Sequence, residues 1–190
     1  MATGIGPVAA GAAADAVLER NSLANALAVG LCGAASPSLD AGDALIYGSI
    51  QHLGDDPIVL DGALAARVAS RLPDAFTGIR GLSVDNVVSS AALKRQLFET
   101  EGIDALDMES FALVRRLRAA GVRVAALRTV SDGPHHDLPD LSGAIDNDGK
   151  LAGTALAVAM LSRPGAAWRM SLGSLRALRA IERCVARLFG

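Results

Sequence analysis

The sequence of 190 residues contains few cysteines and few aromatic side chains. Cys32 and Cys184 are its two cysteines, and their separation matches no metal-binding or redox spacing. This argues against a disulfide framework and makes a reduced, cytoplasmic setting the simplest expectation. Aromatic residues make up 3% of the chain, so alanine, leucine and valine supply most of an apolar content of 51%. That content predicts a folded domain with a sizeable core.

Long hydrophobic runs and an excess of positive charge are also absent. No apolar run reaches the roughly 20 residues needed to span a bilayer, and the first residues lack the basic and apolar regions of a signal peptide. The formal net charge of −2 argues against general nucleic-acid binding, and the sequence contains no DNA- or RNA-binding motif. We expect a single domain over residues 1–190.

Carboxylates follow two apolar segments that are typical of β-strands. Asp107 and Glu109 follow a short apolar segment, and Asp132 follows a β-branched segment at 122–130. Residues 110–120 between them have helical spacing. A strand-helix-strand unit of this length predicts two neighbouring parallel strands, and ligands bind at the carboxyl ends of such strands. The three carboxylates are therefore expected to converge on one cleft. The alternative is that Asp107 and Ser110 cap the helix and Asp132 begins a turn.

Five motifs resemble the nucleoside phosphorylase/nucleosidase superfamily and occur in its order. They are TGIGPV at 3–8, GLCG at 30–33 with LDAGD at 39–43, SVDNVV at 83–88, DMES at 107–110 and LRTVSDG at 127–133. The resemblance implies an α/β fold with three α/β/α layers around a central mixed, largely parallel twisted sheet. Members begin with a strand and loop ahead of the glycine turn. Here Met1 lies almost at that turn, so we expect one or more N-terminal strands to be missing.

The superfamily cleaves the N-glycosidic bond of nucleosides, and the resemblance implies roles for individual residues. Asp132 would protonate or hydrogen-bond N7 of adenine, and burial at a strand end would favour its protonated form. Glu109 would accept hydrogen bonds from the ribose hydroxyls. The implied substrate-binding residues are Met108 against the ribose, Val87 and Val88 along the base, and Ser131, Gly33 and Cys32. Those implied beside the nucleophile or phosphate are Gly4, Gly6 and Gly30.

The sequence does not decide whether the nucleophile is phosphate or water, because basic residues are missing from much of the first third of the chain. Lysine and arginine are absent from 1–18 and from 21–66. A guanidinium matches phosphate oxygens, but neither glycine turn carries one. Phosphate, as a possible co-substrate, would be held by backbone N–H groups, by a distant residue such as Arg128, or by a missing segment. Otherwise the nucleophile is water. No other cofactor is implied.

His135, His136 and Asp137 form a run that raises the question of a metal site. Adjacent histidines on a loop point in different directions, and no further histidine or cysteine lies nearby in the sequence. A solvated or substrate-facing loop is therefore favoured over a metal site.

Residues 163–190 are predicted to form a basic amphipathic helical extension. Helical spacing places arginines on one face and apolar residues on much of the opposite side. The arginines are Arg169, Arg176, Arg179, Arg183 and Arg187, and the apolar residues are Leu175, Leu178, Ile181, Val185 and Leu188. The basic face is either an ordinary solvated surface, a contact with anionic lipid head groups, or a contact with a second copy or an acidic partner.

The leading hypothesis is an enzyme that releases adenine from an adenosyl-type purine nucleoside by phosphorolysis or hydrolysis. The segment DNVVSSAALK at 85–94 and the C-terminal tail look most like the hopanoid-biosynthesis-associated phosphorylase branch, which implies adenosylhopane, a lipid-linked substrate. One alternative is a methylthioadenosine/adenosylhomocysteine nucleosidase. Others are a non-catalytic nucleoside-binding protein and a membrane-surface protein. The resemblance also implies a homodimer or a larger oligomer.

Overall fold

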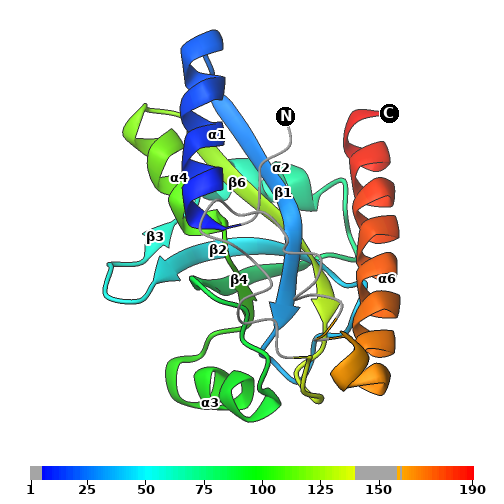
Figure 1. Cartoon of the computed structure of the whole chain (residues 1–190). Helices are drawn as coiled ribbons and strands as arrows, with labels where there is room; N and C mark the ends of the chain where they lie inside the picture. Colours follow the sequence, from blue (N-terminus) through cyan, green and yellow to red (C-terminus); the bar gives the residue numbers. More distant parts are fainter. Residues whose placement is uncertain (1–5, 140–157, 159) are drawn as a thin grey trace.

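The structure is a computed structural model that describes residues 6–139, 158 and 160–190. Gly4 and most of the stretch at 150–161, where the sequence predicts a further helix, lie outside the described residues. Helices are interspersed with strands along the described chain, which confirms the predicted α/β class (Figure 1). In order, the elements are α1 (Pro7–Arg20), β1 (Asn25–Ala34), β2 (Ala44–His52), β3 (Ile58–Val59), α2 (Gly62–Ala69), β4 (Phe76–Ser83), α3 (Ala91–Glu101), β5 (Ala105–Asp107), α4 (Ser110–Ala119), β6 (Arg123–Asp132) and α6 (Pro164–Phe189).

The strands of the described chain form one sheet in the order β3-β2-β4-β5-β1-β6. The long ladders β1–β6 and β2–β4 are parallel, as is β4–β5, and the shorter pairings are antiparallel, which confirms a mixed, largely parallel sheet. Strand β6 also pairs with β2, so the sheet closes on itself. Helices α1 and α4 lie together outside this ring, and α6 runs along another side (Figure 1).

Closure of the sheet depends on local irregularities in the long strands. The β1–β6 register shifts between Cys32 and Gly33, and the β2–β4 register shifts on either side of Tyr47. Such bulges bend a strand and increase its twist. Gly48 and Gly78 face each other at one of these shifts, and a Cβ on Gly48 would lie 3.1 Å from the Cα of Gly78. Two glycines therefore allow the backbones to approach where the sheet bends.

The prediction that β5 and β6 are neighbouring parallel strands is wrong. Strand β1 lies between them, and β5 runs antiparallel to β1. Gly33 of β1 pairs with Leu106 on one side and with Asp132 on the other. Because the three-residue β5 crosses only the end of β1, its carboxyl end still reaches the carboxyl end of β6. The convergence of the acidic motifs is therefore preserved by a different strand order.

Helix α6 packs through small residues against the strand that carries Asp132. Its buried residues are Ala166, Ala167, Gly173, Ala177, Ala180, Cys184 and Leu188. A Cβ on Gly173 would lie 2.1 Å from the carbonyl oxygen of Ser131, so only glycine allows this contact. Of the predicted apolar side, Leu188 is buried with these small residues, whereas Leu175 and Leu178 are about half exposed. None of the helices in the described ranges is long and apolar enough to cross a membrane.

Candidate active site

A cavity of about 180 Å³ opens where β1, β5 and β6 end. It brings together all the residues predicted to act on the base and the sugar, which are Asp132, Glu109, Met108, Val87, Val88, Ser131, Gly33 and Cys32. Asp107 also contributes to its lining, as does Lys94, which the sequence argument did not single out. The structure therefore places residues from four separate motifs around one space that can hold a small molecule.

Glu109 links the DMES motif to the glycine turn of the TGIGPV motif. It is the N-cap residue of α4, and its Oε1 accepts a hydrogen bond of 2.9 Å from the backbone N–H of Gly6. Gly6 has a φ of 91°, a conformation that favours glycine. The glycine turn that begins α1 is thus held against the carboxylate of the acidic motif. Burial raises the pKa of Glu109, although the Gly6 hydrogen bond acts in the opposite direction.

Asp107 has the structural role that the sequence argument left as an alternative. Its side chain is 0% exposed, and its Oδ1 accepts hydrogen bonds from Ser83 Oγ at 2.7 Å and from the backbone N–H of Ser110 at 2.9 Å. It also accepts a bond of 3.1 Å from the N–H of Glu109. These bonds cap α4 and fix the loop that carries Glu109. Asp107 therefore orients the site and is already fully engaged within the protein.

Arg128 is buried and contacts both Asp107 and Ser110 in this network. Its Nε donates to Ser110 Oγ at 2.9 Å and lies 3.3 Å from Asp107 Oδ2. A Cβ on Gly30 would lie 1.9 Å from Nη1 of Arg128, so the glycine leaves room for the guanidinium. The environment of Arg128 is therefore that of a buried ion pair. Gly30 packs against it, whereas Gly33 and Glu109 line the cavity.

Asp132 is held in an ion pair. Lys94 Nζ contacts its Oδ2, and Ser131 Oγ donates to its Oδ1 at 2.7 Å. The Lys94 side chain is 1% exposed and that of Asp132 is 15% exposed. From the sequence, Asp132 was expected to be buried at a strand end, but the buried ammonium of Lys94 beside it was not predicted. A signal was available, because Lys94 shares a helical face with Leu97 and Phe98, which pack into the core.

Cys32 supplies backbone contacts and a neutral thiol to the site. Its carbonyl oxygen lies 3.1 Å from Ser131 Oγ, whose single proton it shares with the closer Asp132 Oδ1 at 2.7 Å. Burial raises the pKa of the Cys32 thiol far above its usual range, and the nearby Asp107 carboxylate adds to the effect. Cys32 therefore stays protonated near neutral pH and lacks the thiolate that a cysteine nucleophile needs.

A second cavity, of about 510 Å³, adjoins the first and shares Ser131 and Asp132 with it. Its other wall comes from α6 and the loop after β6, including Arg169, Arg176, His135 and His136. Within the described ranges no group of three or more histidine, cysteine or acidic side chains is arranged to hold a metal ion. The histidine-rich run thus faces a cavity next to the candidate catalytic carboxylate, as a substrate-facing loop would.

The sequence matches the family model of the phosphorylase superfamily over residues 1–162. Among solved structures, a mutant methylthioadenosine nucleosidase (MTAN) from Helicobacter pylori with 5′-methylthioadenosine in its active site has a TM-score of 0.66 at 16% identity, over 97% of this chain and 78% of that chain. The 5′-methylthioadenosine/S-adenosylhomocysteine nucleosidase from S. pneumoniae has a TM-score of 0.64 at 16% identity, over 93% and 79%. The futalosine hydrolase of Helicobacter pylori has a TM-score of 0.61 at 17% identity, over 94% and 76%. At these identities the likeness shows the fold. No curated protein matches the sequence.

Proposed function

The chain belongs to the phosphorylase superfamily, and from that premise we propose that it cleaves the N-glycosidic bond of an adenosyl-type purine nucleoside and releases adenine. The observation that carries this proposal is the single cavity in which Asp132 and Glu109 meet. One carboxyl group is available for the leaving base and one for the sugar. The chemistry needs both, because cleavage builds negative charge on the base and positive charge on the ribose.

The proposed mechanism places the base between Asp132 and the Val87–Val88 segment. Asp132 hydrogen-bonds and protonates N7 as the bond to the sugar breaks. Glu109 accepts hydrogen bonds from the ribose hydroxyls, and its carboxylate favours the positive charge that develops on the ring. Met108 packs against the ribose. Asp107 and Arg128 act indirectly, by holding the loop that presents Glu109.

Hydrolysis is the form of the reaction that the described cavity favours. Lys94 is the one cation among its described lining residues, and it is paired with Asp132. Arg128 is engaged with Ser110 and Asp107. Leu31, next to Gly30, presents an apolar wall. Among the described residues, the lining of the cavity of about 180 Å³ therefore contains no guanidinium of the kind that commonly holds phosphate, and Arg169 and Arg176 line the adjoining cavity instead.

The test of the nucleophile is adenine release from adenosine and from methylthioadenosine in phosphate-free buffer, followed by chromatography. We expect turnover without phosphate and less than about a twofold increase when phosphate is added, because water needs no anion site. Formation of ribose 1-phosphate, with release only in phosphate, would identify a phosphorylase instead.

Glu109→Gln is expected to lower kcat/KM for nucleoside cleavage by roughly 10- to 100-fold, the range for losing a hydrogen bond to a charged group. The pKa of Glu109 is raised, so its carboxylate becomes protonated at a higher pH than an ordinary glutamate at about 4.3. The acid limb of the wild-type kcat/KM profile should therefore lie above that value. Glutamine does not titrate, and the variant should lose this limb. An unchanged kcat/KM in the variant would remove Glu109 from the ribose site.

The preferred substrate is proposed to be adenosylhopane. Support comes from the resemblance of the 85–94 segment and the C-terminal tail to the hopanoid-associated branch. The adjoining cavity of about 510 Å³ also offers room beside Asp132. Methylthioadenosine and adenosylhomocysteine are the competing substrates, and comparing kcat/KM for the three would separate them. We further propose that the enzyme is a cytoplasmic homodimer or larger assembly, which analytical ultracentrifugation would test.

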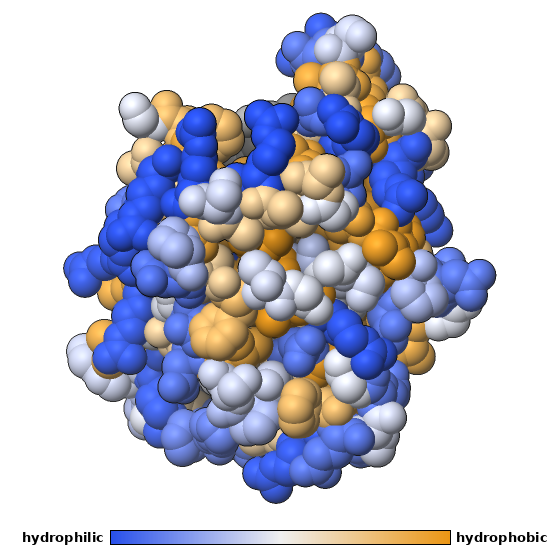
Figure 2. All heavy atoms as spheres, turned by 180° about the vertical axis from the view of Figure 1, so that it is seen from behind, coloured by the Kyte–Doolittle hydropathy of each residue, from blue (hydrophilic) through white to orange (hydrophobic). Residues whose placement is uncertain are grey.

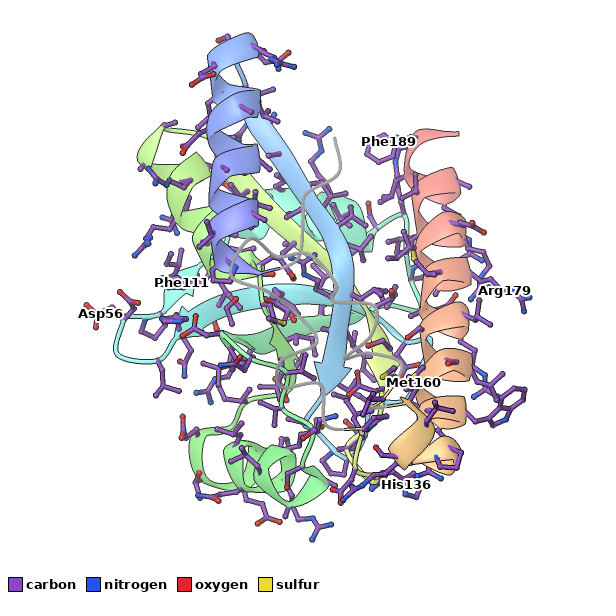
Figure 3. The ribbon with its side chains drawn as sticks, in the orientation of Figure 1. Asp56, Phe111, His136, Met160, Arg179 and Phe189 are labelled. Atoms are coloured by element: carbon purple, nitrogen blue, oxygen red, sulfur yellow. The ribbon has the colours of Figure 1, made fainter. Side chains whose placement is uncertain are left out.

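Helix α6 is proposed to contact an anionic membrane surface. Its exposed side carries an apolar stripe, with Trp168 67%, Leu175 52% and Phe189 74% exposed. An arginine stripe runs beside it. Figure 3 shows that one of these arginines, Arg179, points away from the sheet. Figure 2 shows hydrophilic residues on the side of the molecule where α6 lies. Parallel apolar and basic stripes are typical of helices that lie in a membrane interface.

Replacing Arg179 and Arg183 with alanine is expected to weaken binding to phosphatidylglycerol vesicles about 30-fold, since each arginine near an anionic surface contributes about 1 kcal/mol. Flotation with labelled vesicles measures this. Replacing Arg67 and Arg115 with alanine is the matched control, because both arginines are exposed and lie on other helices. Wild-type protein that stays with neither anionic nor neutral vesicles would exclude membrane contact, and concentration-dependent self-association through α6 would favour a second copy.

A further inference from the structure

Lys94 occupies a position that ordinary helix and core preferences disfavour. It lies in the first turn of α3, where its backbone N–H donates to the carbonyl of Ser90 at 3.1 Å. The positive end of the helix dipole disfavours a cation in this turn. Its side chain is also among the largest fully buried ones in the described chain, and lysine is almost never fully buried unless it is paired. Such local conflicts concentrate at functional sites.

The contacts of Lys94 converge on one carboxylate. Its Nζ contacts Asp132 Oδ2 and lies 3.4 Å from the carbonyl oxygen of Gly133. Ser131 Oγ binds the other carboxylate oxygen, Oδ1. A Cβ on Gly33 would lie 2.8 Å from Oδ2, so the absence of a side chain there leaves space for the ion pair. The carboxylate is therefore fixed on both oxygens while one side still faces the cavity.

We infer that Lys94 acts through Asp132 as a positioning residue: it holds the carboxylate and supplies, by way of that carboxylate, the proton that the leaving base receives. This inference rests on the proposed function and assigns a role that the sequence motifs did not suggest. An isolated carboxylate beside the departing base would oppose the negative charge that develops there. The ammonium offsets the carboxylate, so the pair opposes that charge less than an isolated carboxylate would.

The proton inventory of the step balances without any further reactant. The C1′–N9 bond breaks and its electron pair goes to the base. The Lys94 ammonium passes one proton to the Asp132 carboxylate, which passes it on to N7, so Lys94 is left as the neutral amine and Asp132 as the carboxylate. Water forms the new C1′–O bond and releases one proton, which restores the ammonium. Adenine and the free sugar are the products, and the ion pair returns to its starting state.

The test compares two leaving groups in Lys94→Met and wild type. Adenosine releases a base that must be protonated, whereas p-nitrophenyl β-D-ribofuranoside releases a phenolate that leaves without a proton. We expect Lys94→Met to lower kcat on adenosine about 100-fold, the scale of general acid catalysis, and kcat on the nitrophenyl riboside less than about threefold. Lys94→Arg, which keeps the charge, should recover part of the loss on adenosine.

Arg95→Met is the matched control, because Arg95 is the exposed neighbour of Lys94 on the same helix and should leave both rates unchanged. Circular dichroism of every variant monitors folding. Equal losses on the two substrates, or full activity of Lys94→Met on adenosine, would overturn the role of Lys94 and leave the proposed function standing. A wild-type enzyme that releases adenine from none of adenosine, methylthioadenosine and adenosylhopane would overturn the proposed function, and this inference with it.

Discussion

Asp132→Asn is expected to lower kcat for adenine release about 1000-fold, within the range reported for loss of a general acid or base. Asparagine has nearly the same shape but can neither carry a proton to N7 nor balance the Lys94 ammonium that now contacts Asp132. The substrate still meets the Val87–Val88 segment and Glu109, so KM should change much less than kcat. Steady-state kinetics on adenosine measures both constants.

Asp56→Asn is the control for this substitution. Asp56 is an exposed aspartate in the turn between β2 and β3, and Figure 3 shows it at the tip of that hairpin. The change should leave kcat unaltered. Near-wild-type turnover in Asp132→Asn, with thermal unfolding showing a native fold, would contradict the assignment of Asp132 to the leaving base.

Arg128→Met is expected to lower the free energy of unfolding by about 3 to 5 kcal/mol, the usual cost of removing one member of a buried ion pair. Asp107 is 0% exposed, so its carboxylate would lose its cation without gaining water. Ser110 Oγ would also lose its guanidinium donor. The loop that presents Glu109 depends on the same Asp107, so residual folded protein should also bind nucleoside poorly.

Urea unfolding at equilibrium measures this effect. Arg67→Met on the exposed surface of α2 is the control and should change the free energy of unfolding by less than about 0.5 kcal/mol. If Arg128→Met is as stable as this control, the buried network is not what holds the loop. If it is stable but has lost a dependence on phosphate seen in the wild type, Arg128 would be an anion site instead.

The meeting of the acidic motifs could be predicted from the sequence because strand ends are a local signal. Asp107, Glu109 and Asp132 each follow an apolar strand segment, and the structure brings all three to one cavity. The strand order could not be predicted in the same way. Strand β1 separates β5 from β6, and the ring closes through β2 and β6. These pairings depend on bulges and on contacts between distant segments, which hydrophobic periodicity does not encode.

Individual roles in the site were harder to predict than its location. The spacing could not decide whether Asp107 binds a ligand or caps α4, because both roles use a carboxylate just before a helix. Gly30 belongs to a glycine motif, yet its contact is with the buried Arg128. Lys94 was missed because a lysine in a helix is usually exposed, and its burial depends on Asp132, 38 residues away in sequence.

For helix α6, the sequence predicts the exposed basic face but not the face that packs against the sheet. Its basic stripe follows directly from helical spacing, and the structure leaves those arginines exposed. Which of the other faces is buried depends on how closely the helix approaches β6. The contact of Gly173 with Ser131 selects the alanine and glycine face, and Leu175 and Leu178 remain at the surface.

The measurement that tests the central claim most directly is chromatographic detection of adenine after incubation of the protein with adenosine, methylthioadenosine and adenosylhopane, with calorimetry of adenine binding in parallel. We expect catalytic release of adenine, with one equivalent of free sugar for each adenine, and loss of that release in Asp132→Asn. Adenine that binds to the wild-type protein while no nucleoside is cleaved would contradict this expectation. That result would make the cavity of Asp132 and Glu109 a binding site without catalysis.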